Sequence, residues 1–533
     1  EMAAARPHAE AIVFRERRLT YETLRANVDE FARALLAVGI TRGDRVAVLL
    51  PNRPEWLVAA LATAKIGGIV AAISTFSTSR ELDWALEHSQ ASALVTVGAF
   101  RGHGYLGTLH DLCPELGRSA PGRLRSARWP RLHTVLCVDG GKQDGVFGPR
   151  EFATRAAQVQ GAGLEAAQRA VGPGDVCFIL YTSGSTATPK GVMLAHGDVI
   201  ENGFHIGERQ RLTAADRLWL AVPLFWSFGS ANAFPAILTH GGSVVMQERF
   251  EPGEALELLE RERCSVYYGM ANMARAMIEH PDRGRRRLTA MRTGLTIGLP
   301  EDIAMTMEAV GARELCNVYG STETYGNCAV TDAHDPLPLR LHTQGLPLPG
   351  MEIRAVHPET RRPLAVGEIG ELAVRGLVTP GYYGAPELTR DAFDAEGYFL
   401  TGDVGLMGDD GRVRFRGRLK EIIKTGGINV APLEVEQVLL QHPDVKQAYV
   451  VGLADRDKDE IVAAALELRA GATVGADAIV AFCRERLASY KVPMRLAFCK
   501  AEEFPRTPTG KIHKPGLRER LSAGPESRRP TDG

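Results

Sequence analysis

The stretch Tyr181-Thr-Ser-Gly-Ser-Thr-Ala-Thr-Pro-Lys-Gly191 follows an apolar run over residues 176–180 that has the composition of a buried strand. Its small hydroxyl residues and its lysine suit a polyphosphate, because backbone N–H groups and hydroxyls ring the phosphate oxygens while the ammonium adds positive charge. The order Pro189-Lys190-Gly191 excludes a Walker A loop, in which glycine directly precedes Lys-Ser/Thr. A flexible turn with an incidental lysine is the plain alternative.

The composition is that of an ordinary folded protein with more than one domain. The chain has 533 residues, 45% apolar and 24% charged, which exceeds what one compact core organises. A net charge of −1 gives no overall field that would attract nucleic acid or an anionic membrane. No apolar run reaches the roughly 20 residues of a membrane span. Because the first residues lack the apolar core of a secretion signal, we expect a cytoplasmic protein.

The cysteines and lysines are distributed unevenly. Eight scattered cysteines form no CxxC pair, which predicts buried thiols rather than disulfides or a zinc site. Of the 63 basic residues only 11 are lysines, and five of these lie beside glycine- or proline-bearing loops: Lys190, Lys420, Lys424, Lys491 and Lys511. A lysine ammonium is compact and mobile, whereas arginine is a fixed fork. These lysines are therefore candidates for groups that follow a charge during a reaction.

Strand and helix patterns alternate from the N-terminus to about residue 317. Predicted strands cover 46–50, 69–73, 93–97, 218–222, 244–246, 265–268 and 292–296, and predicted helices cover 20–36, 56–61 and 81–88. We expect Asp198 to cap a further helix that continues through Val199 and Ile200. This alternation predicts an α/β fold, with a large N-terminal domain of parallel sheets covered by helices.

The pattern changes after about residue 340. Short alternating strands at 352–356, 370–375 and 412–415 predict a small antiparallel β unit, followed by a turn at residues 417–420. Helices at 433–440 and 477–487, the second capped by Asp477, and strands at 445–453 and 461–468 predict a small α+β domain. The chain is thus divided into an N-terminal domain (1–416), a hinge (417–420), a C-terminal domain (421–521) and a disordered tail (522–533).

Four further segments suit a nucleotide. The segment Asn317-Val-Tyr-Gly-Ser-Thr-Glu323 places an aromatic ring, a hydroxyl and a carboxylate at a strand end, although a helix cap would use the same residues. In Tyr398-Phe-Leu-Thr-Gly-Asp403, the aspartate of a tight turn would accept from two ribose hydroxyls or serve the turn alone. The segments 417–427 and 505–512 place lysines beside glycines, with solvated basic loops as the alternative.

These five segments, in this order and spacing, resemble the motif series of the adenylate-forming superfamily. That family contains acyl- and aryl-CoA synthetases, peptide-synthetase adenylation domains and beetle luciferases, and the resemblance covers residues 10–520. It implies a mobile C-terminal lid domain and the use of ATP, Mg²⁺ and coenzyme A, with AMP and pyrophosphate as products. The motif order is far more specific than any single segment.

The resemblance assigns roles residue by residue. The residues that would bind the phosphates are Thr182, Ser183, Gly184, Ser185, Thr186, Thr188 and Lys190. Adenine falls to Gly298, Leu299, Pro300 and Tyr319, with Asn317 and Gly320 in the same nucleotide motif. Thr322 would contact the α-phosphate, Glu323 would hold Mg²⁺, and Asp403 with Arg418 would bind the ribose. Lys511 would act in adenylation and Lys420 as the hinge, whereas Lys424, Gly426 and Gly427 would serve thioester formation.

Departures from the family pattern concern the substrate. Ala187 stands where the family usually has glycine, which reduces the freedom of the phosphate loop. Trp226 stands where acyl-CoA synthetases often have histidine, and the aspartate that pairs with an amino acid is missing. We therefore expect a largely apolar acid (fatty, aryl or bulky polycyclic) in a pocket lined by Trp226, Phe228, Tyr268, Met270 and Tyr325. Each of these side chains is otherwise an ordinary core residue.

The sequence predicts an ATP-dependent acyl-CoA synthetase that uses a small carboxylic acid and CoA. An acyl-AMP ligase that loads a carrier protein is the nearest alternative, and the short spacing from Glu323 to Gly345 with the intact Gly426-Gly427 pair favours CoA. A non-catalytic acyl-adenylate or nucleotide sensor is disfavoured because binding alone does not require the mobile lysines. A luciferase-like oxygenase shares every motif. Monomer and homodimer both stay open.

Overall fold

The structure, a computed structural model, describes residues 1–140, 143–182, 189–425, 428–455, 458–506 and 512–523. The chain forms two compact units. Unit 1 comprises residues 1–353 and 374–399, and unit 2 comprises residues 354–373 and 400–533. The hinge proposed at residues 417–420 falls inside unit 2 and, like the other predicted domain limits, stays a prediction.

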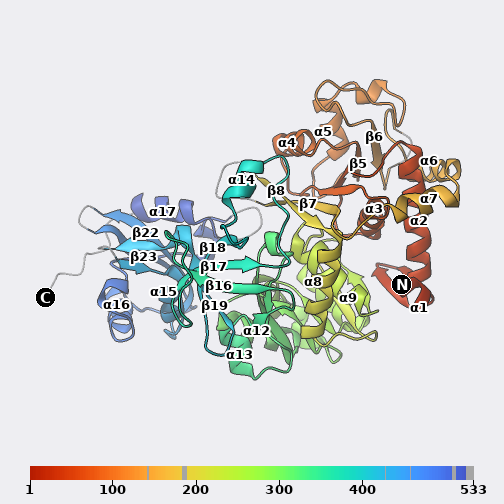
Figure 1. The fold of residues 1–533 in the computed structure, drawn as a ribbon. Helices are drawn as coiled ribbons and strands as arrows, with labels where there is room; N and C mark the ends of the chain where they lie inside the picture. Colours follow the sequence, from red (N-terminus) through yellow and green to blue (C-terminus); the bar gives the residue numbers. More distant parts are fainter. Residues whose placement is uncertain (141–142, 183–188, 426–427, 456–457, 507–511, 524–533) are drawn as a thin grey trace. The chain divides into compact units, whose positions relative to one another are not determined.

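A six-stranded sheet in unit 1 carries the predicted phosphate loop. Its strand order is β6-β5-β3-β4-β7-β8, and all neighbours are parallel except β7 and β8 (Figure 1). The strands are β3 (Arg45–Leu49), β4 (Ile69–Ala72), β5 (Ala93–Thr96), β6 (Thr134–Cys137), β7 (Val176–Thr182) and β8 (Lys190–Ala195). Their near-continuous apolar sequences match strands that are covered on both faces. The strands expected at 46–50, 69–73, 93–97 and 176–180 are thus confirmed.

A nine-stranded sheet completes unit 1, in the order β15-β14-β13-β12-β11-β9-β10-β1-β2. Its central strands from β13 to β1 are parallel. The strands are β1 (Glu10–Phe14), β2 (Arg17–Thr20), β9 (Arg217–Leu220), β10 (Ser243–Met246), β11 (Val266–Tyr268), β12 (Thr293–Thr296), β13 (Glu314–Tyr319), β14 (Ala329–Val330) and β15 (Leu346–Pro347). The C-terminal ends of β11, β12 and β13 bear Tyr268, the 298–300 segment and Tyr319.

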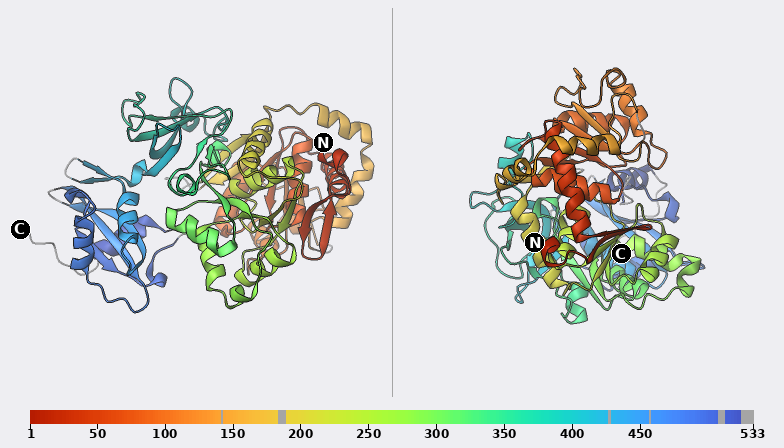
Figure 2. Two further views of the ribbon diagram at one scale, coloured as in Figure 1. Left: turned by 90° about the horizontal axis from the view of Figure 1, so that it is seen from below. Right: turned by 90° about the vertical axis from the view of Figure 1, so that its right-hand side faces the viewer.

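Helices cover these sheets. They are α1 (Met2–Ala5), α2 (Tyr21–Ala37), α3 (Pro54–Lys65), α4 (Ser79–Ser89), α5 (Tyr105–Leu112), α6 (Pro149–Arg155), α7 (Gly161–Arg169), α8 (His196–Arg209), α9 (Phe234–Thr239), α10 (Pro252–Arg261), α11 (Ala271–Glu279), α12 (Pro300–Val310), α13 (Leu337–His342) and α14 (Pro386–Asp391). Helices α3 and α4 contact β3, and α8 and α9 lie side by side (Figures 1 and 2). The predicted α/β fold with parallel sheets is confirmed.

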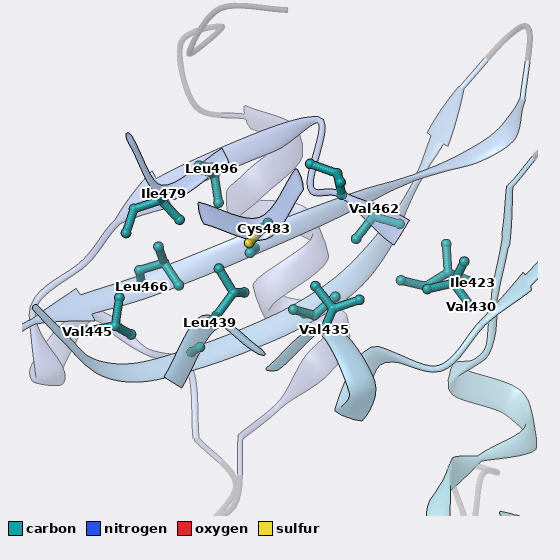
Figure 3. Close-up of a cluster of buried hydrophobic side chains, with 14 residues drawn as sticks. Ile423, Val430, Val435, Leu439, Val445, Val462, Leu466, Ile479, Cys483 and Leu496 are labelled. Carbon is teal, nitrogen blue, oxygen red and sulfur yellow. The ribbon is translucent and has the colours of Figure 1, made fainter. Parts of the chain in front are cut away.

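Unit 2 combines a four-stranded and a five-stranded sheet with three helices. The strands of the first are β16 (Glu352–Val356), β17 (Gly370–Arg375), β18 (Phe399–Met407) and β19 (Val413–Arg418), in sequence order. The second contains β20 (Ile423–Thr425), β21 (Ile428–Val430), β22 (Val445–Asp455), β23 (Asp459–Leu468) and β24 (Arg495–Phe498), and the helices are α15 (Pro432–Leu440), α16 (Ala476–Arg484) and α17 (Lys514–Ala523). The core packs Val435 and Leu439 of α15 against Val462 and Leu466 of β23 (Figure 3). The expected small α+β domain is confirmed.

The helix caps predicted at Asp198 and Asp477 are wrong. Helix α8 begins at His196 with Ala195 as its N-cap, so Asp198 lies inside the first turn. There its carboxylate accepts a hydrogen bond from the Tyr325 hydroxyl at 2.8 Å. Helix α16 begins at Ala476 with Gly475 as its N-cap, which places Asp477 in its first turn too. In both helices the acidic residue lies near the positive end of the helix dipole without capping it.

Two predicted turns are parts of strands. Asp403 lies within β18, because Gly402 adopts φ +69° and bends the chain without ending the ladder. Strand β19 continues through Gly417 to Arg418, after which residues 419–421 form a single 3₁₀ turn. At the C-terminus, α17 extends to Ala523, two residues into the expected tail, and residues 524–533 lie outside the described part.

All eight cysteines are free and buried, as the sequence predicts. Within the described ranges, the helices are too short or too polar to cross a membrane. In that same part of the chain, His, Cys, Asp and Glu side chains do not gather in groups of three or more that would hold a metal by themselves.

Candidate active site

The two ends of the predicted phosphate loop lie opposite each other. Strands β7 and β8 pair antiparallel, with Thr182 opposite Lys190. The loop residues Ser183, Gly184, Ser185, Thr186, Ala187 and Thr188 lie outside the described residues. At the base of the loop, His88 Nδ1 lies 3.2 Å from the Tyr181 hydroxyl, and the Trp84 and His88 rings stack with centroids 4.7 Å apart. Burial lowers the pKa of His88, so the imidazole beside the loop is uncharged at neutral pH.

The nucleotide motif at residues 317–323 begins at the end of β13. The Asn317 amide is committed to the protein, since Nδ2 donates to the Thr343 carbonyl and Oδ1 accepts from the Val318 N–H. Tyr319 is buried. A Cβ atom on Gly320 would lie 2.5 Å from the Gly326 carbonyl oxygen, so the close approach of two backbones requires glycine there. Asn317 and Gly320 thus shape the motif from inside the protein.

Thr322 and Glu323 follow on a 3₁₀ turn over residues 322–324. The Thr322 and Ser227 hydroxyl oxygens lie 3.1 Å apart. Glu323 Oε1 accepts a hydrogen bond from the Tyr382 hydroxyl at 3.0 Å, and the Glu323 carbonyl accepts from the Thr379 N–H at 2.7 Å. Glu323 is therefore held through both its side chain and its backbone by a segment about 60 residues further along the chain.

That segment, residues 379–383, is a functional candidate that the sequence reasoning missed. It runs antiparallel along β8. The Met193 N–H donates to the Gly381 carbonyl and the Tyr383 N–H donates to the Gly191 carbonyl, so that Val192 and Tyr382 lie opposite each other as a β-bridge pair. We call residues 379–383 the clasp. Its sequence signal is a glycine followed by two tyrosines, which alone does not separate a site from a packed turn.

Tyr382 of the clasp lies between the two charged residues of the nucleotide motifs. The Lys190 ammonium lies 5.1 Å from the centre of the Tyr382 ring, within the range of a cation–π contact, while the hydroxyl donates to Glu323. Burial and then the Glu323 charge raise the pKa of Tyr382, so the phenol stays protonated and remains a donor. One aromatic side chain thus joins the lysine of one motif to the carboxylate of another.

The predicted adenine segment precedes α12. Leu299 is the N-cap of that helix, and Pro300 is its first residue. A Cβ atom on Gly298 would lie 2.8 Å from the Asp302 Cβ, so the backbone here lies directly on Asp302. Burial raises the pKa of Asp302, although Arg275 donates to its Oδ1 at 3.2 Å. The segment is thus supported by a half-buried carboxylate.

The five predicted acyl-pocket residues divide into two groups. The Phe228 and Tyr268 rings are in contact, with centroids 5.2 Å apart, and Trp226 and Met270 are half-buried close to them in sequence. Tyr325 is fully buried, and its hydroxyl donates to Asp198 and accepts from the Ala195 N–H at 3.1 Å. Tyr325 therefore fills a hydrogen-bonded place in the core, and its role as a pocket residue stays a prediction.

Unit 2 brings together the two predicted ribose ligands. Asp403 and Arg418 are cross-strand partners in β18 and β19, with Arg418 Nε 2.9 Å from Asp403 Oδ1. The aspartate is buried, whereas the arginine side chain is 46% exposed. Lys420 and Lys424 are exposed. Gly426, Gly427 and Lys511 lie outside the described residues, and Lys491 is ion-paired with Glu434 at 2.5 Å between Nζ and Oε1.

Comparisons with known proteins identify the family of the chain. Residues 1–383 match the family described as AMP-binding enzyme, and residues 434–511 match the AMP-binding enzyme C-terminal domain. The putative acyl-CoA synthetase YngI of Bacillus subtilis is 35% identical over 98% of this chain and 95% of that protein. The mitochondrial medium-chain acyl-CoA ligase ACSF2 of Danio rerio is 33% identical over 96% of this chain and 86% of that protein.

A solved structure extends the likeness to three dimensions. The crystal structure of ATP-bound MatB from Rhodopseudomonas palustris is similar over 97% of this chain and 96% of that one, with a TM-score of 0.81 and 28% identity. Both the sequence matches and the fold cover nearly the whole chain. The chain therefore belongs to the AMP-binding enzyme family, in the acyl-CoA synthetase branch of the adenylate-forming ligases.

Proposed function

We propose that this enzyme is an ATP-dependent acyl-CoA synthetase that converts a largely apolar carboxylic acid, ATP and CoA into acyl-CoA, AMP and pyrophosphate. The observation that carries the proposal is the convergence of Lys190 and Glu323 on Tyr382. A cation and a carboxylate held around one ring suit a polyphosphate that needs positive charge from both a lysine and a metal ion. The relatives named as acyl-CoA synthetase and medium-chain ligase support the same activity.

In the first half-reaction a carboxylate oxygen attacks the α-phosphorus of ATP. The new carboxyl–phosphorus bond forms as the bond to the β-phosphate oxygen breaks, and pyrophosphate leaves. No general base is needed, because the acid is already ionised at neutral pH. Lys190 neutralises the charge that develops on the leaving pyrophosphate, Thr322 donates to the α-phosphate, and Lys511 reaches the attacking carboxylate.

Magnesium fits the donor set around Glu323. When bound, Mg²⁺ neutralises phosphate charge, and it usually takes one or two protein carboxylates with phosphate and water oxygens as its other ligands. Glu323 offers one carboxylate, and the Tyr382 hydroxyl fixes its orientation through Oε1. The described residues hold no cluster that would bind a metal without ATP, which agrees with a metal that arrives with the nucleotide.

In the second half-reaction the CoA thiolate attacks the acyl carbonyl carbon, and AMP leaves. We assign the ribose to Asp403 and Arg418, whose pair on neighbouring strands combines a buried acceptor with an exposed fork of donors. Lys420 is the proposed hinge, and Lys424 with Gly426 and Gly427 serves the thioester step. Rotation about Lys420 would exchange Lys511 for this second set between the two half-reactions.

The test is pyrophosphate release across a panel of carboxylic acids, with MgATP and with or without CoA. Acid-dependent release and acyl-CoA formation support the proposal. Pyrophosphate release without acyl-CoA formation, together with acyl transfer to a carrier protein, would show that the acceptor is a carrier protein and not CoA. ATP binding without any pyrophosphate release would identify a non-catalytic binding protein.

Variants separate the two half-reactions. Lys511→Ala should abolish adenylation and largely spare thioester formation from supplied acyl-AMP, whereas Lys424→Ala should do the reverse. Equal loss of both half-reactions in Lys511→Ala would contradict the role given to this lysine. Selective loss of adenylation in Lys424→Ala would contradict the role of the 424–427 segment.

A further inference from the structure

A cluster of five buried polar side chains lies beside the predicted acyl pocket. Asn202 comes from α8, Gln210 from the residue after α8, Asn232 from the π-helical turn 228–233, Tyr268 from the end of β11, and Asn327 from the segment before β14. All five are 0% exposed. We call them the amide cluster. Neutral amides and a phenol fully removed from water cost free energy unless each finds a hydrogen-bond partner.

Hydrogen bonds join these side chains. Gln210 Nε2 donates to the Tyr268 hydroxyl at 2.9 Å, and that hydroxyl donates to Asn232 Oδ1 at 3.1 Å. Asn202 Nδ2 donates to the backbone carbonyl of Asn327 at 2.8 Å, so this bond joins a side chain to the main chain. A Cβ atom on Gly326 would lie 2.9 Å from Asn232 Nδ2, which places the Asn327 segment directly against Asn232. The cluster is therefore one contiguous polar region.

Several polar atoms of the cluster have no partner among the residues that the structure describes. Two are amide donors and three are carbonyl acceptors: Asn232 Nδ2, Asn327 Nδ2, Gln210 Oε1, Asn202 Oδ1 and Asn327 Oδ1. Buried polar groups in proteins are nearly always paired, and an apolar side chain of the same shape would avoid the cost. Donors and acceptors left over in the same buried region thus indicate a ligand that pairs with both kinds of group.

The π-helical turn 228–233 connects the amide cluster with the predicted nucleotide motif at residues 317–323. Ser227, immediately before the π-helical turn, lies within hydrogen-bond distance of Thr322, the predicted α-phosphate contact. Phe228 begins the turn and its ring contacts Tyr268, and Asn232 lies near the end of the turn. π-Helical turns are rare and occur frequently at functional sites. An acid whose carboxylate lies at Thr322 would therefore extend past Phe228 towards Asn232.

We propose that the amide cluster forms the far end of the acyl site and binds a hydrogen-bonding group, such as a hydroxyl, keto or amide group, on an otherwise apolar acid. This inference rests on the proposed function. Phe228 and Trp226 contact the apolar part of the acid, and Asn232 and Tyr268 select the polar group. A site built to hydrogen-bond a substrate group rejects the analogue that lacks it, because its own buried groups are then unpaired.

The first experiment uses the unmodified enzyme. Acids are compared in pairs of equal length, each pair differing by one hydroxyl, keto or amide group along the chain, and kcat/KM is measured by pyrophosphate release. We expect at least one polar acid to exceed its apolar partner by about 10-fold or more. Apolar acids that equal or exceed every polar partner would overturn the proposal and leave the synthetase function intact. Absence of release with any acid would overturn both.

Variants then test the residues. Asn232→Leu and Tyr268→Phe should bring the polar-to-apolar ratio of kcat/KM close to one, whereas Phe228→Leu should change the preferred chain length and keep that ratio. Tyr268→Phe removes only a hydroxyl, so it remains informative if Asn232→Leu does not fold. A lower melting temperature with an unchanged ratio in Tyr268→Phe would identify the cluster as structural and overturn the proposal.

Discussion

On the nucleotide side of unit 1, the residues Lys190 and Glu323 are partly exposed and meet at one buried ring, whereas on the acyl side Tyr268 and Asn232 are fully enclosed. The first arrangement leaves charged groups accessible to a ligand that arrives with its own charge. The second removes neutral polar groups from water before any ligand arrives. Under the proposed function, charge neutralisation dictates the residue types on the nucleotide side, and the shape and polarity of the acid dictate them on the acyl side.

The clasp explains why the nucleotide side holds its geometry although it joins distant parts of the chain. Residues 379–383 form two backbone hydrogen bonds along β8, on either side of the Val192–Tyr382 pair, and one to Glu323. The end of the predicted phosphate loop and Glu323, the proposed Mg²⁺ ligand, are thereby fixed to the same five residues. Changes on this side should lower the adenylation rate for every acid alike, whereas changes on the acyl side should alter the choice of acid.

The largest expected effect is that of Glu323→Gln. Loss of the carboxylate removes the proposed protein ligand of Mg²⁺. We expect a loss comparable to that of one oxyanion-hole donor, about 2.7–4 kcal/mol or roughly 100- to 1000-fold in kcat, because both groups stabilise transition-state charge. The measurement is acid-dependent pyrophosphate exchange over a range of Mg²⁺ concentrations. All acids should be affected equally, and a changed order of acid preference would contradict the separation of the two sides.

Tyr382→Phe should have a smaller effect on the same assay. It removes the hydrogen bond to Glu323 and keeps the ring under Lys190, and a hydrogen bond to a charged group is worth about 1.5–3 kcal/mol, or roughly 10- to 100-fold. Tyr382→Leu should lose more, because the cation–π contact with Lys190 disappears as well. Higher Mg²⁺ concentrations should partly restore Tyr382→Phe.

The neighbouring Tyr383 supplies the matched control for the clasp. Its backbone pairs with Gly191, while its ring lies against His88. Tyr383→Phe should therefore leave the Mg²⁺ dependence unchanged. Equal losses in Tyr382→Phe and Tyr383→Phe, without rescue by Mg²⁺, would indicate that the clasp acts only through packing.

On the nucleotide side the sequence offers candidates directly, because their residue types are specified by chemistry. A lysine after a hydroxyl-rich loop and a carboxylate after a strand end are unusual in composition, so Lys190 and Glu323 stand out without any structure. The predicted strands that precede them, β7 and β13, are confirmed, since short apolar runs are strong local signals. Tyr382 escaped prediction because a tyrosine beside glycine has the same local pattern in a packed turn.

On the acyl side and at helix ends, residue type says little about which group a side chain contacts. Tyr325 has the composition of a pocket residue, yet its hydroxyl bonds Asp198 from a different element. Asp198 and Asp477 are of a residue type that often caps helices, but α8 begins two residues before Asp198 and α16 begins one residue before Asp477. The five residues of the amide cluster are widely separated in sequence, and only the fold brings them together.

Tyr325→Phe tests which side of this division Tyr325 belongs to. The change leaves the Asp198 carboxylate and the Ala195 N–H without their hydroxyl partner, which should reduce the free energy of unfolding by about 1–3 kcal/mol. Denaturant unfolding measures the loss, and the acid panel measures selectivity. If Tyr325 is a core residue, the order of preferred acids stays the same; a reordered panel with unchanged stability would make it a pocket residue.

The smallest effect is expected at Asp302, beneath the predicted adenine segment. Burial raises the pKa of this carboxyl above its ordinary value of 3.8, so the folded state holds the proton more tightly than the unfolded state. The contribution of Asp302 to stability is therefore most favourable at low pH and falls as the pH rises from 3.8 through the raised pKa. Above that pKa the full free-energy cost of the ionised carboxylate is present. Asp302→Asn should raise the melting temperature at pH 7, by an amount that shrinks as the pH is lowered towards 3.8. A gain independent of pH, or a loss at pH 7, would mean that the ion pair with Arg275 outweighs burial. If Asp302→Asn behaves as expected, the nucleotide side keeps a charged side chain that costs stability. On the acyl side, the polar side chains that cost stability are neutral amides.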